Sequence, residues 1–139
     1  MSAVVVLDTE AVSLLTPERR HDPGRRRLMA HLEQADAVIT PRVARVEAMT
    51  PRDARHADLN RLVRDAEEFP PLRNRGRGIA DAAASVRSRL GTDIAVVDAL
   101  VGAVADELVA EVVEIITDDT ADIAAVTDAL DATVHVVSV

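Results

Sequence analysis

A short run of β-branched residues near the N-terminus, ending abruptly on a carboxylate, constrains the fold of this chain more than any other feature. The run is Val4–Leu7, and Asp8, Thr9 and Glu10 follow it directly. A continuous apolar run of this kind is typical of a strand buried on both faces of a parallel sheet. Because such sheets place their sites at the carboxyl ends of their strands, Asp8 is predicted to point into a crevice there.

Three later segments have the same strand character and alternate with helical patterns: Ala37–Thr40, Glu111–Thr117 and Thr133–Val139. Residues 69–72 could add a brief edge strand. Helices are predicted over Glu10–Leu15, Pro23–Gln34, Pro41–Met49, Pro51–Glu68, Ile79–Leu90, a segment capped by Thr92 with Asp93 in its first turn, and Thr120–Leu130. This order predicts one α/β domain over residues 1–139, with a mostly parallel central sheet and helices on both faces.

Length and composition limit the chemistry. A chain of 139 residues can bury a core without disulfides. Cysteine is absent, which excludes a disulfide framework, a thiolate metal site and a cysteine nucleophile. The N-terminus has no signal-peptide pattern, and no apolar run has the length of a membrane span. We therefore expect a soluble, cytoplasmic protein that does not associate with a membrane.

Charge is distributed unevenly along the chain. The net charge is −8, yet all 16 basic residues are Arg and the last is Arg89, while residues 90–139 contain eleven acids. A mildly basic part beside an acidic part suits phosphate contacts next to a cation site, and two solvated charged faces fit the same pattern equally well. The loop containing Arg73, Arg75 and Arg77 is the best candidate for touching phosphates, with a plain turn as the alternative.

Two acids fall on helical faces that the pattern predicts to be buried. Glu47 is adjacent to Val46 and four residues after Val43, although a lone Glu on a helix is commonly just solvated. Asp98 lies four residues after Ile94, within an apolar stripe that also contains Val97, Val101 and Leu108. An ionised carboxylate there is costly unless it is paired, protonated or bound to a metal. Asp98 is therefore the acid that solvation explains least well.

A second predicted strand also ends on carboxylates. Glu111–Thr117 runs into Asp118 and Asp119, and Asp122 follows three residues later. A single Asp at this position could merely cap the helix that begins at Thr120. The arrangement nevertheless mirrors Leu7 and Asp8 at the end of the first strand, which favours one acidic site at the carboxyl edge of the sheet.

Four motifs taken together resemble the PIN domain. They are Leu7-Asp8-Thr9 after an apolar strand, Pro41 with Glu47 six residues later, Val97-Asp98-Ala99-Leu100, and Ile116-Thr117-Asp118-Asp119 followed by Asp122. The resemblance covers essentially the whole chain and is closest to the single-domain toxins of VapBC-type toxin–antitoxin systems. It implies a three-layer α/β fold and a metal-dependent endoribonuclease.

The resemblance also implies roles for individual residues. Asp8, Glu47, Asp98 and Asp119 would form the catalytic, metal-binding quartet, with Asp122 as an auxiliary ligand and Thr117 as a hydroxyl near the site. Of these, Asp8 and Asp98 are expected to contact the metal directly. Their hard oxygen atoms suit Mg²⁺ or Mn²⁺, which would promote hydrolysis of an RNA phosphodiester. Toxins of this family usually form homodimers and are neutralised by a small antitoxin protein that inserts into the acidic groove.

The chain departs from the family pattern in two places. Glu10 adds an acid near the site, and position 118 is Asp where a non-acidic residue is commoner, so either Asp118 or Asp119 could face the site. Phe69 is the one aromatic residue, so RNA recognition would rest on Arg contacts to phosphate rather than on base stacking. The alternative function is a catalytically silent PIN-fold module that binds a protein or RNA partner, but the presence of all four acids favours the enzyme.

Other functional classes fit the sequence poorly. A receiver domain needs a Lys, which this chain lacks, and a dinucleotide site needs a glycine-rich turn where Asp8-Thr9-Glu10 stands. The four His residues have no zinc-ligand spacing, and no Ser lies in a nucleophile-elbow context.

Overall fold

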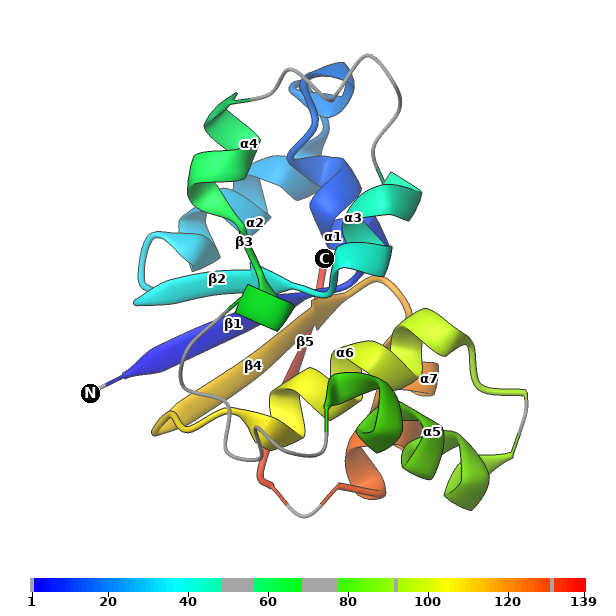
Figure 1. The fold of residues 1–139 in the computed structure, drawn as a ribbon. Helices are drawn as coiled ribbons and strands as arrows, with labels where there is room; N and C mark the ends of the chain where they lie inside the picture. The colour runs from blue at the N-terminus through cyan, green and yellow to red at the C-terminus, as the bar shows by residue number, and fades with distance from the viewer. Residues whose placement is uncertain (1, 49–56, 69–77, 92, 131) are drawn as a thin grey trace.

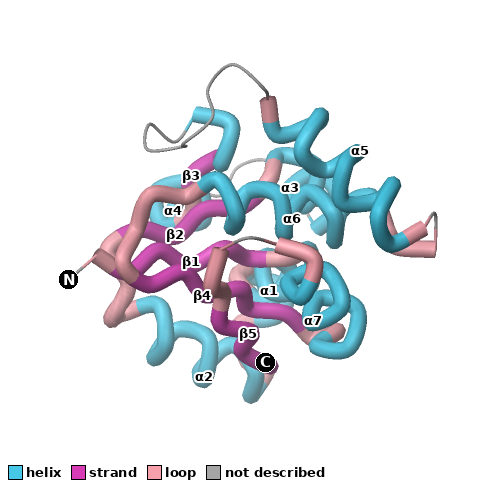
Figure 2. Tube along the Cα trace, turned by 90° about the horizontal axis from the view of Figure 1, so that it is seen from below, coloured by secondary structure: helices cyan, strands magenta, loops and turns pink. Residues whose placement is uncertain are grey.

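One parallel sheet organises the computed structural model, which describes residues 2–48, 57–68, 78–91, 93–130 and 132–139. Its five strands lie side by side in the order β3-β2-β1-β4-β5 (Figures 1 and 2), and every neighbouring pair is parallel. The strands are β1 (Ala3–Leu7), β2 (Ala37–Thr40), β3 (Arg64–Asp65), β4 (Val112–Thr117) and β5 (His135–Ser138). The predicted α/β fold is therefore confirmed, with a sheet that is wholly rather than mostly parallel.

Seven α-helices surround this sheet in the described part of the chain: α1 (Thr9–Leu14), α2 (Pro23–Leu32), α3 (Arg42–Ala48), α4 (Ala57–Leu62), α5 (Ile79–Leu90), α6 (Val96–Glu107) and α7 (Thr120–Asp128). Short 3₁₀ turns occupy Pro17–Arg19 and Ala66–Glu68. Among the described residues, no helix combines the length and apolar character needed to cross a membrane.

Alternate residues of β1 enter two different cores, as a strand buried on both faces requires. Val5 and Leu7 pack with residues of α1, α2 and α4, whereas Val4 and Val6 pack with residues of α6 and α7. Helices α5, α6 and α7 share a third apolar cluster. The result is three layers, with the sheet between α1, α2 and α4 on one side and α5, α6 and α7 on the other (Figure 1).

The predicted helix over residues 51–68 is wrong in its second half. Helix α4 ends at Leu62, and Arg64–Asp65 pairs with β2 instead. Arg45 holds this segment by donating to the Val63 carbonyl at 2.7 Å and to Asp65 Oδ1 at 2.9 Å. Tertiary hydrogen bonds thus override a local helical pattern. The first residues of that predicted helix, the edge strand at 69–72 and the arginine loop at 73–77 lie outside the described residues.

Gly102 lets α6 and α7 approach each other closely. A Cβ atom at this position would lie 2.2 Å from Val126 Cγ1, far inside van der Waals contact. Val126 is fully buried and β-branched, so its side chain has little freedom to move away. The separation of these two helices matters for function because α6 and α7 carry Asp98 and Asp122 in their first turns.

We expect Gly102→Ala to lower the free energy of unfolding by about 1–3 kcal/mol, because overpacking outweighs the better helix propensity of Ala. Urea denaturation measures this loss. In a Val126→Ala background the clashing methyl is gone, and the same substitution should then cost little or nothing. An equal cost in both backgrounds would show that the clash with Val126 is not its cause.

Candidate metal centre

A groove of about 500 Å³ opens at the carboxyl edge of the sheet, between α1, α3 and the beginning of α6. Its lining contains six carboxylates from four separate segments of the chain: Asp8, Glu10, Glu47, Asp98, Asp118 and Asp119. The four residues predicted as a quartet therefore line one groove. Asp122 does not line it but lies against Asp98 and Asp119.

Asp8 is the most deeply placed of these acids, with 4% of its surface exposed. It is the N-cap of α1, and its Oδ1 accepts a hydrogen bond from the Ala11 N–H at 2.9 Å. Burial raises the pKa of Asp8 above its ordinary value, while hydrogen bonds from the Thr117 hydroxyl and the Ala11 N–H oppose the rise. The Asp8 side chain thus both begins a helix and contributes a buried carboxylate to the groove.

Asp119 also has two roles. Its side chain caps α7 by accepting from the Asp122 N–H at 3.2 Å, which confirms the capping interpretation. Its own N–H donates to Thr117 Oγ1 at 2.9 Å. Thr117, fully buried at the end of β4, therefore contacts both Asp8 and Asp119 and couples the two strand ends.

Asp98 lies in the first turn of α6, because this helix begins at Val96. The prediction that Asp98 follows Ile94 by one turn of the same helix is therefore wrong, because Ile94 precedes the helix. The prediction that Asp93 lies in the first turn is wrong for the same reason. Thr92, the predicted cap, lies outside the described residues. Val97 and Val101 are buried as predicted, and Asp98 itself is partly buried. The consequence for the site is that Asp98 projects from a helix N-terminus towards the strand ends.

Burial raises the pKa of Asp98 to about 6, and repulsion from Asp119, Asp122 and Asp8 adds to the effect. The pKa of Asp122 is also raised, chiefly by the charge of Asp119. One carboxylate oxygen from each of Asp98, Asp119 and Asp122 lies within 4.8 Å of the others. These three side chains form a compact group of negative charge.

This group fits a hard divalent cation. All of its donors are carboxylate oxygens, which Mg²⁺ and Mn²⁺ prefer. Oxygens bound to one Mg²⁺ at about 2.1 Å lie no more than about 4.2 Å apart, so the three side chains would need to close only slightly. A cation would also remove the repulsion that raises the pKa of Asp98. Asp98, Asp119 and Asp122 thus form a candidate metal centre.

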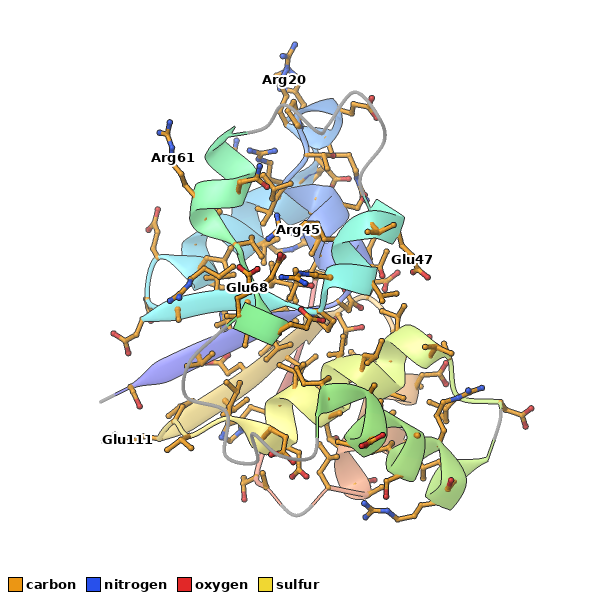
Figure 3. The ribbon with its side chains drawn as sticks, viewed as in Figure 1. Arg20, Arg45, Glu47, Arg61, Glu68 and Glu111 are labelled. Atoms are coloured by element: carbon orange, nitrogen blue, oxygen red, sulfur yellow. The ribbon has the colours of Figure 1, made fainter. Side chains whose placement is uncertain are left out.

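Glu47 lines the groove, but it does not lie on a buried face of its helix as predicted. Val43 and Val46 are 41% and 75% exposed, so α3 does not bury that face; Ala44 is its buried residue. Glu47 is exposed and accepts a hydrogen bond from Thr9 Oγ1 at 3.1 Å. Figure 3 shows Arg45 and Glu47 on different sides of α3, so that Arg45 anchors the helix while Glu47 remains available at the groove.

The sequence did not indicate the contact of Thr9 with Glu47, because nothing local links Thr9 to a residue 38 positions away.

The structure also shows where Glu10, Asp118 and Asp119 lie. Glu10 forms an ion pair with Arg19, which compensates its charge. Asp118 and Asp119 both line the groove, but only Asp119 belongs to the three-carboxylate group.

Comparisons of this chain with protein-family models, curated proteins and solved structures find no match. The fold and the groove define an α/β protein with an all-parallel five-stranded sheet and a possible acidic metal site.

Asp98 should make stability depend on pH in metal-free buffer. A pKa that is higher in the folded protein than in the unfolded chain means that stability is lost as pH rises from about 4 to about 6. We expect Asp98→Asn to raise the free energy of unfolding by about 1–2 kcal/mol at pH 8 and to change it little at pH 4. Chemical denaturation at both pH values, in EDTA, measures the difference. A gain of equal size at both pH values would contradict the raised pKa.

Proposed function

We propose that this chain is a PIN-like, metal-dependent endoribonuclease that hydrolyses RNA phosphodiester bonds. The observation that carries the proposal is the convergence of Asp8, Glu47, Asp98 and Asp119 on one groove from four segments of the chain. A site that binds only one cation needs fewer acids than this. The carboxyl edge of a parallel sheet is also where α/β proteins place their chemistry.

The side chains of the groove would have different roles in such a site. Asp98, Asp119 and Asp122 would hold the cation, and Asp8 and Glu47 face the same groove. A bound Mg²⁺ or Mn²⁺ supplies Lewis acidity and an acidified water for attack on phosphorus. The uncompensated acids would otherwise repel the RNA backbone, so substrate should enter the groove only in the presence of the cation. Asp8, fixed by Ala11 and Thr117, would give the site a rigid wall.

We further propose that the protein is the toxin of a type II toxin–antitoxin pair. The support is the resemblance of its motifs to VapBC-type toxins, together with an acidic groove that is open to solvent. A small antitoxin inserting a cationic side chain into this groove would neutralise Asp98 and its neighbours in place of the metal. A homodimer is part of the same proposal, and size-exclusion chromatography with light scattering tests it.

Purified protein should cleave single-stranded RNA with Mn²⁺ or Mg²⁺ and stop when EDTA is added. Asp98→Asn and Asp119→Asn should each lower the rate by roughly a hundredfold or more, because both remove a charged ligand. Asp128→Asn is a matched control on α7, since it removes an exposed carboxylate outside the groove. Cleavage that persists in the groove variants or in EDTA would refute the assignment.

Metal binding itself gives an independent readout. Mn²⁺ at a hundred times its dissociation constant should raise the free energy of unfolding by about 2.7 kcal/mol. Asp98→Asn and Asp122→Asn should lose most of this gain, while Asp128→Asn should keep it. Metal stabilisation without RNA cleavage would favour the silent binding module over the enzyme.

A further inference from the structure

A second hollow, of about 620 Å³, runs along α2 from the turn before the helix to Glu33 at its end, and its lining contains three arginines and two acids. Arg20, Arg25 and Arg26 contribute guanidinium groups to it, and His21 adds an imidazole. Arg20 and Arg26 are exposed, and Figure 3 shows Arg20 extending away from the body of the molecule. This arginine hollow is distinct from the acidic groove.

The arginine hollow keeps a positive charge although two acids also line it. Asp22 forms an ion pair with Arg19 at 2.8 Å and caps α2 by accepting a hydrogen bond from the Gly24 N–H at 2.8 Å. Its negative charge is therefore offset by Arg19. Among the described residues no carboxylate pairs with Arg20 or Arg26. Glu33, at the end of α2, is the remaining acid of the lining. Arg20 donates from Nε to His21 Nε2 at 3.2 Å, and its terminal N–H groups, like the guanidinium of Arg26, have no carboxylate partner among the described residues.

Arg25 has a structural role in the same hollow. It donates to the Thr16 carbonyl at 2.9 Å and more weakly to the Leu14 carbonyl at 3.4 Å. These bonds fix the corner between α1 and α2 without neutralising the charge of Arg25, since carbonyl groups carry none. The arginine hollow therefore combines one partly buried arginine that is anchored to the backbone with two exposed arginines.

The arginine hollow begins at the edge of the sheet where the acidic groove lies, and it continues along α2 to Glu33 at the end of that helix. Helix α2 runs from this edge to the opposite one, where the residue just before β2, Asp36, bonds to Ala3 at the start of β1. Helix α1 begins beside the groove at Thr9 and ends at Leu14, and the 3₁₀ turn at Pro17–Arg19 then leads to Arg20 of the hollow. Arg19 links them directly, because it pairs with Glu10 of the groove and with Asp22 of the hollow.

We propose that the arginine hollow binds the phosphate backbone of the RNA strand whose scissile bond lies in the acidic groove. The proposal rests on the proposed function and adds the missing attraction, since a groove of six carboxylates cannot itself draw in a polyanion. Guanidinium groups match phosphate oxygens with paired hydrogen bonds. Recognition of this kind is independent of base identity and does not require aromatic side chains.

The test compares an Arg20→Gln/Arg26→Gln variant with Arg89→Gln, which removes an exposed arginine from α5 on the other side of the sheet. Binding of a fluorescein-labelled single-stranded RNA is measured by anisotropy over a salt series, in an Asp98→Asn background so that the RNA stays intact. The double variant should bind roughly tenfold more weakly, with the slope of log affinity against log salt reduced by about 1.4. In the active protein it should raise KM and leave kcat unchanged.

The possible results separate this proposal from the nuclease assignment. Unchanged binding and salt slope in the double variant, or an equal loss in Arg89→Gln, would overturn the arginine hollow while leaving cleavage intact. A wild-type protein that binds RNA through Arg20 and Arg26 without cutting it would support the hollow and refute the nuclease. Binding of polyglutamate in place of RNA would mean that the hollow takes an acidic protein, which also overturns the proposal. Thermal melting confirms that each variant is folded.

Discussion

The pairing of β1 with β4 is the interaction on which the rest of the site depends. The register opposes Leu7 to Ile116, and the Asp8 N–H then donates to the Ile116 carbonyl at 3.2 Å. Asp8 and Thr117 therefore leave the two central strands side by side. A slip of one residue would turn these side chains to the opposite faces and bury charge in the core. The apolar residues of both strands thus determine where the carboxylates meet.

Carboxylates gathered at one edge of the sheet repel one another, and hydrogen bonds or an ion pair stabilise several of them. Asp8 and Asp119 receive backbone N–H groups at the N-termini of α1 and α7, Thr117 contacts both, and Glu10 is paired with Arg19. Asp98 is partly buried, and this burial together with repulsion from Asp119 and Asp122 raises its pKa to about 6. Helix capping and metal binding are compatible uses of the same carboxylate, because each carboxylate oxygen has two lone pairs and a cap bond uses only one of them.

Acidic and basic side chains gather at two separate places in the fold. Acids from both halves of the chain converge on the groove, while Arg20, Arg25 and Arg26 surround a hollow at the other end of α1. A net charge of −8 taken alone argues against a polyanionic partner, but local charge decides what a surface attracts. Arg19 connects the two regions, because it forms ion pairs with Glu10 of the groove and with Asp22 of the hollow.

The sequence by itself determined the strand core and the helices at residues 23–32, 79–90 and 120–128, because apolar runs, prolines and caps are local signals. It also indicated which acids follow strand ends. It could not reveal that Arg64–Asp65 extends the sheet, that Thr9 bonds to Glu47, or that Asp98 lies in the first turn of its helix. The first two features depend on hydrogen bonds between residues far apart in the chain, and the third depends on where α6 begins, so only the tertiary structure decided them.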